Sequence, residues 1–307
     1  WRFEGLQDTR TPWFGPRHQA SGAAEFLFTP SGASVALVPP GSYRIRATRG
    51  PAFEAWETEV TLTPGGRSEL HAKLTPIAIP EGWVAVTGRT FGASNPSLPM
   101  SPVDRSRRLV CDGFAWVGPG GGVPPGVPDS LNLAAALGVL GDAGSDAAVA
   151  GASVGATTWD PAAGEERIYA HAPGGTAAEV REALRGGKTL STNGPFVEFT
   201  LEGTSIGGRV RRGPGMARGH LRVLAAGWVD VRRVLVLVNG VVDAVYMVRG
   251  REGHLRFDED IEFYVNESGP VSIRVEGDDP LDAAGMGPAR PLAVTGPIWV
   301  DIPEAGR

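Results

Sequence analysis

Cysteine is nearly absent from this chain. The single residue, Cys111, permits no internal disulfide and cannot build a thiolate metal site. It follows Leu109 and Val110 on an expected helix face, where packing in the core is favoured over a role as nucleophile. Cysteine usage therefore leaves the redox compartment open.

Long apolar runs and an excess of positive charge are also missing. No apolar segment reaches the roughly 18 residues of a membrane-spanning helix, so we expect no transmembrane segment. The net charge of −5 argues against a nucleic-acid surface, and we interpret Arg209, Arg211 and Arg212 as a solvated cluster. With 42% hydrophobic and 21% charged residues, the 307-residue chain has an ordinary composition and room for two or three domains.

Histidine is sparse and scattered. The five histidines are His18, His71, His171, His220 and His254. No two of them have the i, i+2 or i, i+4 spacing of paired metal ligands. His171 is interpreted as a surface or hydrogen-bonding residue.

The first 80 residues carry β signals separated by turns rich in proline and glycine. The run 43–48 alternates apolar and polar residues, which is typical of a strand with one buried face and one solvated face. The expected strands are 25–29, 34–38, 42–48, 56–62 and 68–74. We predict a small β-sandwich over residues 1–80.

Residues 81–188 alternate expected strands with capped helices. A helix begins at Ser101 with Pro102 in its first turn, and a second begins at Asp129 or Ser130. The capping box Thr176-Ala-Ala-Glu179 predicts a third, which carries Val180, Ala183 and Leu184 and ends at Gly186. Short strands are expected at 82–91, 114–117 and 147–154. This alternation predicts parallel βαβ units.

From residue 189 onward the signals are again β, and we predict a second sandwich over 189–307. Asn239-Gly240 between two valine-rich runs is a strong signal for a two-residue hairpin. The acidic run Asp258-Glu259-Asp260 is interpreted as a solvated turn, with a calcium site as the alternative. The expected strands are 196–201, 221–225, 231–238, 241–248, 254–257, 261–265, 271–276 and 297–302.

Several of these segments resemble one family. Residues 82–91, Gly-Trp-Val-Ala-Val-Thr-Gly-Arg-Thr-Phe, with the following Asn-Pro-Ser and Ser-Pro-Val-Asp-Arg, resemble the first strand and helix of the CehA/McbA-type metallohydrolases of the PHP superfamily. Residues 37–51 resemble the carboxypeptidase-regulatory-like module that precedes that hydrolase domain. Five short segments resemble, in order and spacing, the C-terminal part of proteins of the same family. They are Ser191-Thr-Asn-Gly-Pro195, Ile206-Gly207, Gly227-Trp-Val-Asp230, Val238-Asn-Gly240 and Ala293 to Asp301.

The resemblance also implies that the metal site is lost. Aligned without a gap, Arg89 and Phe91 stand where the family's first two metal-binding histidines would be, and Val154 and Ala156 match a later Asp-Ser-His-like run. A guanidinium has no lone pair to give and a phenyl ring has no ligand atom. We therefore expect no metal and no cofactor, and a buried Arg89 paired with a carboxylate or with carbonyl groups.

The expected fold is mixed β and α/β: an N-terminal β-sandwich, a shortened PHP-like α/β remnant and a C-terminal β-sandwich. The first hypothesis is a non-catalytic pseudoenzyme that binds a protein partner or forms a homo-oligomer. One alternative is an active metal-dependent hydrolase of esters or phosphoesters, with Asp112, Asp129, Asp160 and His171 as ligands. A second alternative, motivated by eight tryptophans, is a carbohydrate- or surface-binding module.

The resemblance further implies a secreted protein, at an extracellular, periplasmic or outer-surface location. The printed sequence begins at Trp1 and not at methionine. We therefore expect a processed or excised product.

Overall fold

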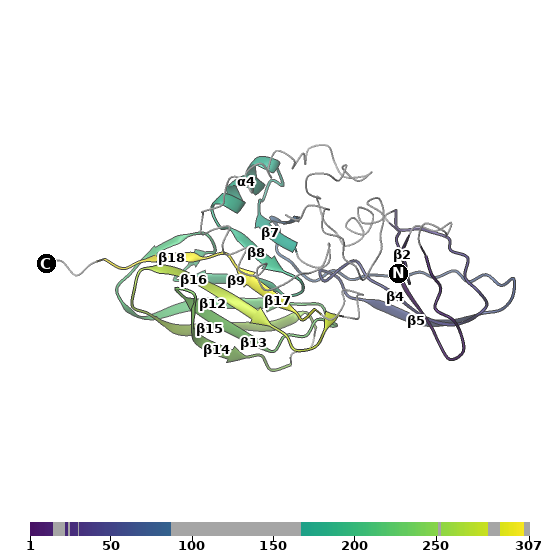
Figure 1. Cartoon of the computed structure of the whole chain (residues 1–307). Helices are drawn as coiled ribbons and strands as arrows, with labels where there is room; N and C mark the ends of the chain where they lie inside the picture. The colour runs from purple at the N-terminus through teal and green to yellow at the C-terminus, as the bar shows by residue number, and fades with distance from the viewer. Residues whose placement is uncertain are drawn as a thin grey trace.

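The computed structural model of the protein describes residues 1–14, 22–23, 25–29, 31–86, 167–250, 253–281 and 289–303. Within these ranges the chain forms three β-sheets and one α-helix (Figure 1). The predicted β-rich character is thereby confirmed. The helices expected to begin at Ser101 and Asp129 and the strands expected at 114–117 and 147–154 lie outside the described residues.

The N-terminal strands form one antiparallel sheet, drawn in purple and blue in Figure 1. In sheet order they are β2 (Gly22–Ala23), β3 (Phe26–Leu27), β1 (Arg2–Gly5), β4 (Gly41–Ala47) and β5 (Trp56–Leu62). Tyr43, Ile45 and Ala47 of β4 are buried. Arg44, on the opposite face, pairs with Glu4 and Glu59 of the neighbouring strands. The predicted alternation is confirmed.

Two expected N-terminal strands are not formed, and the described residues of this part make a single sheet instead of the predicted sandwich. Segments 34–38 and 68–74 have no strand hydrogen bonding. They cover the apolar face of the sheet, where Val38 and Leu70 pack against the cluster of Phe3, Tyr43 and Ile45. The residues of these segments are typical of strands because they are partly buried. β propensity reflects burial and packing as well as strand pairing, so it does not distinguish the two cases.

The C-terminal part is a sandwich of two sheets, as predicted. The smaller sheet has the order β10 (Thr204–Ser205), β9 (Phe196–Leu201), β12 (Gly215–Leu224) and β15 (Leu255–Val265). The larger, nine-stranded sheet runs β11 (Arg209–Arg211), β18 (Ile298–Asp301), β16 (Gly269–Glu276), β17 (Leu292–Thr295), β8 (Thr189–Thr192), β7 (Arg167–His171) and β6 (Trp83–Val86), with β13 (Arg233–Val238) and β14 (Val241–Met247) attached to β16.

The main core lies between these two sheets. Phe199, Leu221 and Phe263 project into it from the smaller sheet, and Val236 and Ile273 from the larger one. All five side chains are at most 2% exposed. Burying one such side chain contributes about 1.5–3 kcal/mol, so this core is the main source of stability for the C-terminal part.

The prediction of parallel units in residues 81–188 is wrong where that segment is described. β6 pairs antiparallel with β7, and β7 pairs antiparallel with β8, so these strands extend the nine-stranded sheet. A PHP-like α/β arrangement is not seen in the described part of the segment. The helix between β7 and β8 returns the chain to the adjacent position of the sheet, so no parallel crossover is made.

That helix, α4 (Ala177–Arg185), begins and ends where the sequence predicts. The Thr176 hydroxyl accepts a hydrogen bond from Glu179 N at 3.3 Å, and Thr176 N donates to the Glu179 carboxylate at 3.4 Å. Val180 and Leu184 are buried against Ala170 of β7, and Gly186 caps the carboxyl end. The capping box therefore fixed the start of the helix from local sequence.

Specific contacts join the N-terminal sheet to the C-terminal sandwich. The Trp228 indole donates to Phe53 O at 2.9 Å, and the Glu54 carboxylate accepts from Gly227 N at 2.7 Å. Glu54 also contacts His254 Nε2 at 2.9 Å. Ile77, which follows the N-terminal sheet, is buried in the core of the sandwich. The two parts are packed together through these residues.

α4 is too short to cross a membrane, and no helix in the described ranges has the length and apolar character of a membrane span.

Candidate functional site

Most of the predicted site residues fall outside the described ranges. These are Arg89, Phe91, Val154, Ala156, Asp112, Asp129 and Asp160. The lost metal site, the pairing of Arg89 and the alternative ligand set therefore stay predictions. Among the described residues, no group of three or more His, Cys, Asp or Glu side chains is arranged to hold a metal.

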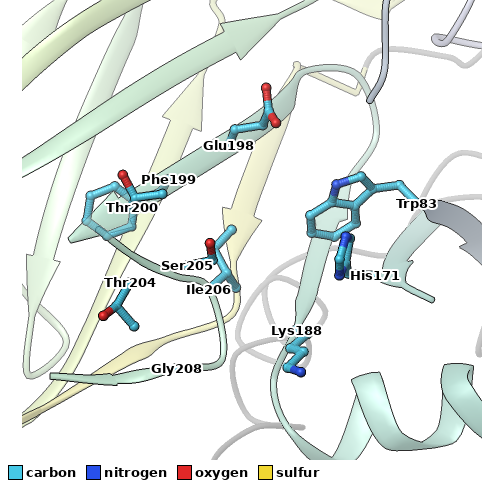
Figure 2. Close-up of a pocket in the computed structure, with 10 residues that line it drawn as sticks. All are labelled: Trp83, His171, Lys188, Glu198, Phe199, Thr200, Thr204, Ser205, Ile206 and Gly208. Atoms are coloured by element: carbon cyan, nitrogen blue, oxygen red, sulfur yellow. The ribbon is translucent and has the colours of Figure 1, made fainter. Parts of the chain in front are cut away.

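His171, the remaining candidate, lines a cleft of about 400 Å³ between the edges of the two C-terminal sheets. Figure 2 shows Trp83, His171 and Lys188 on one side of the cleft. Thr200, Thr204, Ser205 and Ile206, from β9, β10 and the residue that follows, form the opposite side. The cleft therefore opens where β6 and β10, the outermost described strands of the two sheets on this side, approach each other.

Trp83 and His171 are held by ring contacts. Their ring centroids lie 5.1 Å apart at an interplanar angle of 61°, and the indole meets Phe196 edge-on with centroids 5.4 Å apart. Gly82, at φ +87°, leaves room for the imidazole, because a Cβ there would lie 3.3 Å from His171 Nε2. These contacts fix the orientation of the indole at the cleft wall.

Lys188 directly precedes β8, which pairs with β7. It lies beside His171 of β7 because His171 N donates to Lys188 O at 3.0 Å. Its aliphatic stem crosses Gly207, where a Cβ would come within 2.6 Å of Lys188 Cγ. Of the 29 lysines and arginines, two are lysines, Lys73 and Lys188. Lys188 is exposed, and within the described ranges its ammonium group has no carboxylate partner.

Glu198 is a second charged residue among the described residues of the cleft, but its charge is balanced. Its carboxylate pairs with Arg222 Nη1 at 3.2 Å on the outer face of the smaller sheet. Among the described residues that line the cleft, Lys188 is the charged side chain without an ionic partner. Sequence reasoning missed Lys188, although the rarity of lysine beside abundant arginine was a signal available in the sequence.

The acidic run Asp258 to Asp260 was predicted to be a solvated turn, and this prediction is wrong. The run lies within the long strand β15. His220 of β12 lies between two of its carboxylates, with Nδ1 2.9 Å from Asp260 Oδ1 and Nε2 3.1 Å from Asp258 Oδ1. The neighbouring Arg218 pairs with Glu262 at 2.9 Å. Basic residues on β12 thus face acidic residues on β15, a pairing that stabilises adjacent strands.

Calcium is accordingly expected not to stabilise the protein. A strand holds the carboxylates of Asp258 and Asp260 in a row against His220, whereas calcium takes about six to eight oxygen ligands that converge on one point. Thermal unfolding with and without millimolar CaCl₂ should give the same midpoint. A rise in the midpoint with calcium that equal MgCl₂ does not reproduce would contradict this expectation.

An apolar surface lies on the outer side of β13 and β14, and we call it the β14 face. It consists of Leu235, Leu237, Val242, Val245 and Met247, which are paired across the two strands as Leu235 with Val245 and Leu237 with Val242. Val242, Val245 and Met247 are 46%, 52% and 66% exposed. Val234 and Val236 of β13 face inward and are fully buried, so the other side of these strands belongs to the core.

The far edge of β14 closes one side of the sandwich. The Tyr246 hydroxyl donates to Glu262 O at 2.7 Å and accepts from Glu262 N at 3.0 Å, and the Asp243 carboxylate accepts from Tyr264 N at 2.8 Å. These side chains cap backbone groups on the exposed edge of β15 and so protect that edge against strand addition. The valine-rich pair singled out in the sequence therefore leaves an apolar face exposed and protects a neighbouring strand edge.

Comparisons of this chain with protein-family models, with the curated proteins and with the solved structures gave no match. The resemblance to the CehA/McbA-type metallohydrolases therefore stays a prediction from the residues quoted above.

Proposed function

We propose that this protein is a non-catalytic binding or assembly protein, derived from a PHP-type metallohydrolase, and that it docks through the β14 face. The observation that carries the proposal is the exposure of Val242, Val245 and Met247 beside half-buried Leu235 and Leu237. Contiguous exposed apolar residues are typical of a surface that another molecule covers.

The partner we propose is a second copy of this chain. Two arginines next to the face are already paired within the protein: Arg233 Nε lies 2.6 Å from the Glu276 carboxylate, and Arg274 lies 2.6 Å from the same group. Asp243 is engaged by Tyr264 N. These three charged groups are therefore not available to recognise an oppositely charged partner, whereas an apolar face is complementary to itself across a two-fold axis.

The resemblance supports the non-catalytic part of the proposal, because the histidines that bind metal in the family are replaced at Arg89 and Phe91. It also supports a location outside the cytoplasm. The dimer should bury more than about 1,000 Å², the usual size of a specific interface.

Light scattering after size-exclusion chromatography tests the proposal. The unmodified protein is expected at twice the chain mass of 32.1 kDa, and Val245→Asp is expected to shift it to the monomer, because an unpaired carboxylate would be buried in the interface. Val35→Asp is the matched control, since Val35 is 82% exposed on the N-terminal part, and this variant should stay dimeric.

Three outcomes would contradict the proposal: an unmodified protein that is monomeric at tens of micromolar, a Val245→Asp variant that remains dimeric, or turnover of phosphodiester or ester substrates. Turnover that is lost on removal of metal, and in variants of Asp112, Asp129, Asp160 or His171, would favour the hydrolase alternative.

A further inference from the structure

We propose that the cleft beside Trp83 binds a sugar carboxylate, a hydroxylated ring that carries one negative charge. This inference concerns a different surface from the β14 face and does not depend on dimerisation. It rests on three features of the cleft: its charge, its aromatic wall and its hydroxyl groups.

The charge favours a monoanion. Glu198 is balanced by Arg222, whereas Lys188 has no carboxylate partner in the described part of the chain. The stem of Lys188 packs over Gly207, where a Cβ would lie 2.6 Å from Lys188 Cγ. Lys188 lies on the same side of the cleft as Trp83 and His171 (Figure 2). An ammonium group with three donors binds a carboxylate through a charge-assisted hydrogen bond.

The aromatic wall favours a ring. Trp83 is half-buried and is held by edge contacts with His171 and Phe196, so the indole is oriented before any ligand arrives. An indole offers a flat apolar surface and one N–H donor. A pyranose ring presents both C–H groups and hydroxyl groups and so suits such a wall.

The opposite wall favours a hydroxylated ligand over a plain aromatic acid. Thr200, Thr204 and Ser205 line it, and among the described residues their hydroxyls have no hydrogen-bond partner. Each hydroxyl can donate and accept. A volume of about 400 Å³ lies within the range of small-molecule sites and accommodates one sugar ring with water.

The scarcity of lysine makes a direct test practical. Reductive methylation with ¹³C-formaldehyde keeps the positive charge and labels Lys73, Lys188 and the terminal amine, and Lys73→Met and Lys188→Met assign the signals. Titration with sodium glucuronate is expected to shift the Lys188 signal saturably, with a Kd of about 1 mM, and to leave the exposed Lys73 signal unchanged.

Binding to unlabelled protein, measured by calorimetry, supplies the controls. Glucose lacks the charge, acetate lacks the ring and benzoate lacks the hydroxyls, so each is expected to bind at least about tenfold more weakly than glucuronate. Lys188→Met should weaken glucuronate binding by the same factor, and Lys73→Met should leave it unchanged. An oligogalacturonate that binds more tightly than the monosaccharide would identify the end of an acidic polysaccharide as the source of the carboxylate.

Equal shifts of the two lysine signals, unchanged binding by Lys188→Met, or equal affinity for acetate or benzoate would overturn the inference. The same titration on Val245→Asp separates the two proposals. Glucuronate binding by that variant, whatever its oligomeric state, would support the cleft independently of the β14 face.

Discussion

Replacing Asn193 by alanine is expected to lower the free energy of unfolding by about 2–5 kcal/mol. Asn193 is fully buried between β8 and β9. Its amide nitrogen donates to Arg290 O at 2.7 Å, and its amide oxygen accepts from Leu292 N at 2.7 Å. Alanine would remove the hydrogen-bond partner of both partly buried backbone groups, and each lost partner costs about 1–3 kcal/mol.

Urea unfolding at neutral pH measures this loss. Asn193→Asp should be at least as destabilising, because a carboxylate cannot donate to Arg290 O and its charge is costly to bury. Asn266→Ala is the matched control, since Asn266 is exposed, and it should change stability by less than about 0.5 kcal/mol. A small effect of Asn193→Ala would mean that this contact does not hold β17 in place.

Replacing Asp230 by asparagine is expected to cost about 1.5–3 kcal/mol at pH 7. The carboxylate accepts hydrogen bonds from Asp278 N at 2.8 Å and Asp279 N at 3.2 Å and pairs with Arg232 at 2.9 Å. Its side chain is 14% exposed. An asparagine loses the charge, and its amide group presents donors toward backbone N–H groups.

The pH dependence of this cost follows from the pKa of Asp230. Burial raises the pKa of the carboxyl, but the hydrogen bonds from Asp278 N, Asp279 N and Arg232 outweigh it and hold the pKa below the ordinary value of 3.8. A lowered pKa in the folded state adds stability that is fully present above the ordinary pKa. That stability is lost as the pH falls through the pKa of the folded state.

The difference in stability between the unmodified protein and Asp230→Asn should therefore be the same at pH 7 and pH 5, and it should shrink below about pH 4. Unfolding curves at these pH values provide the measurement. Asp279→Asn is the control, because Asp279 is 71% exposed and its weak pair with Arg232 spans 3.6 Å. A difference that widens on acidification would refute the assigned role of the carboxylate.

Asn193 and Asp230 both belong to the sequence segments that carry the family resemblance. Their contacts hold distant segments together: Asn193 joins the loop before β9 to β17, and Asp230 joins the segment before β13 to the turn after β16. Gly207, from a third segment, lies under Lys188 at a positive φ. Residues of these three motifs therefore make contacts that hold the sandwich together. Their presence indicates the fold and is no evidence of catalysis.

Local sequence determined several elements. The capping box at Thr176 set the start of α4, and Asn239-Gly240, with φ of 53° and 78°, forms the predicted two-residue hairpin between β13 and β14. The alternation in 43–48 correctly placed one face of β4 in the core. Each of these signals depends on residues within a few positions of one another, so no distant partner was needed to interpret them.

Tertiary structure decided the rest. The sequence could not show that β6 and β7 join the edge of the C-terminal sheet, because the choice of strand neighbour depends on which distant edge is free. The sequence also predicted two strands, 254–257 and 261–265, in place of the single strand β15. The acidic run between them can continue the strand because it pairs with basic residues of β12, and His220 lies 40 residues from Asp260. The cleft is likewise assembled from β6, β7, β9 and β10. Its residues carry no motif, because only the packing of two sheet edges brings them together.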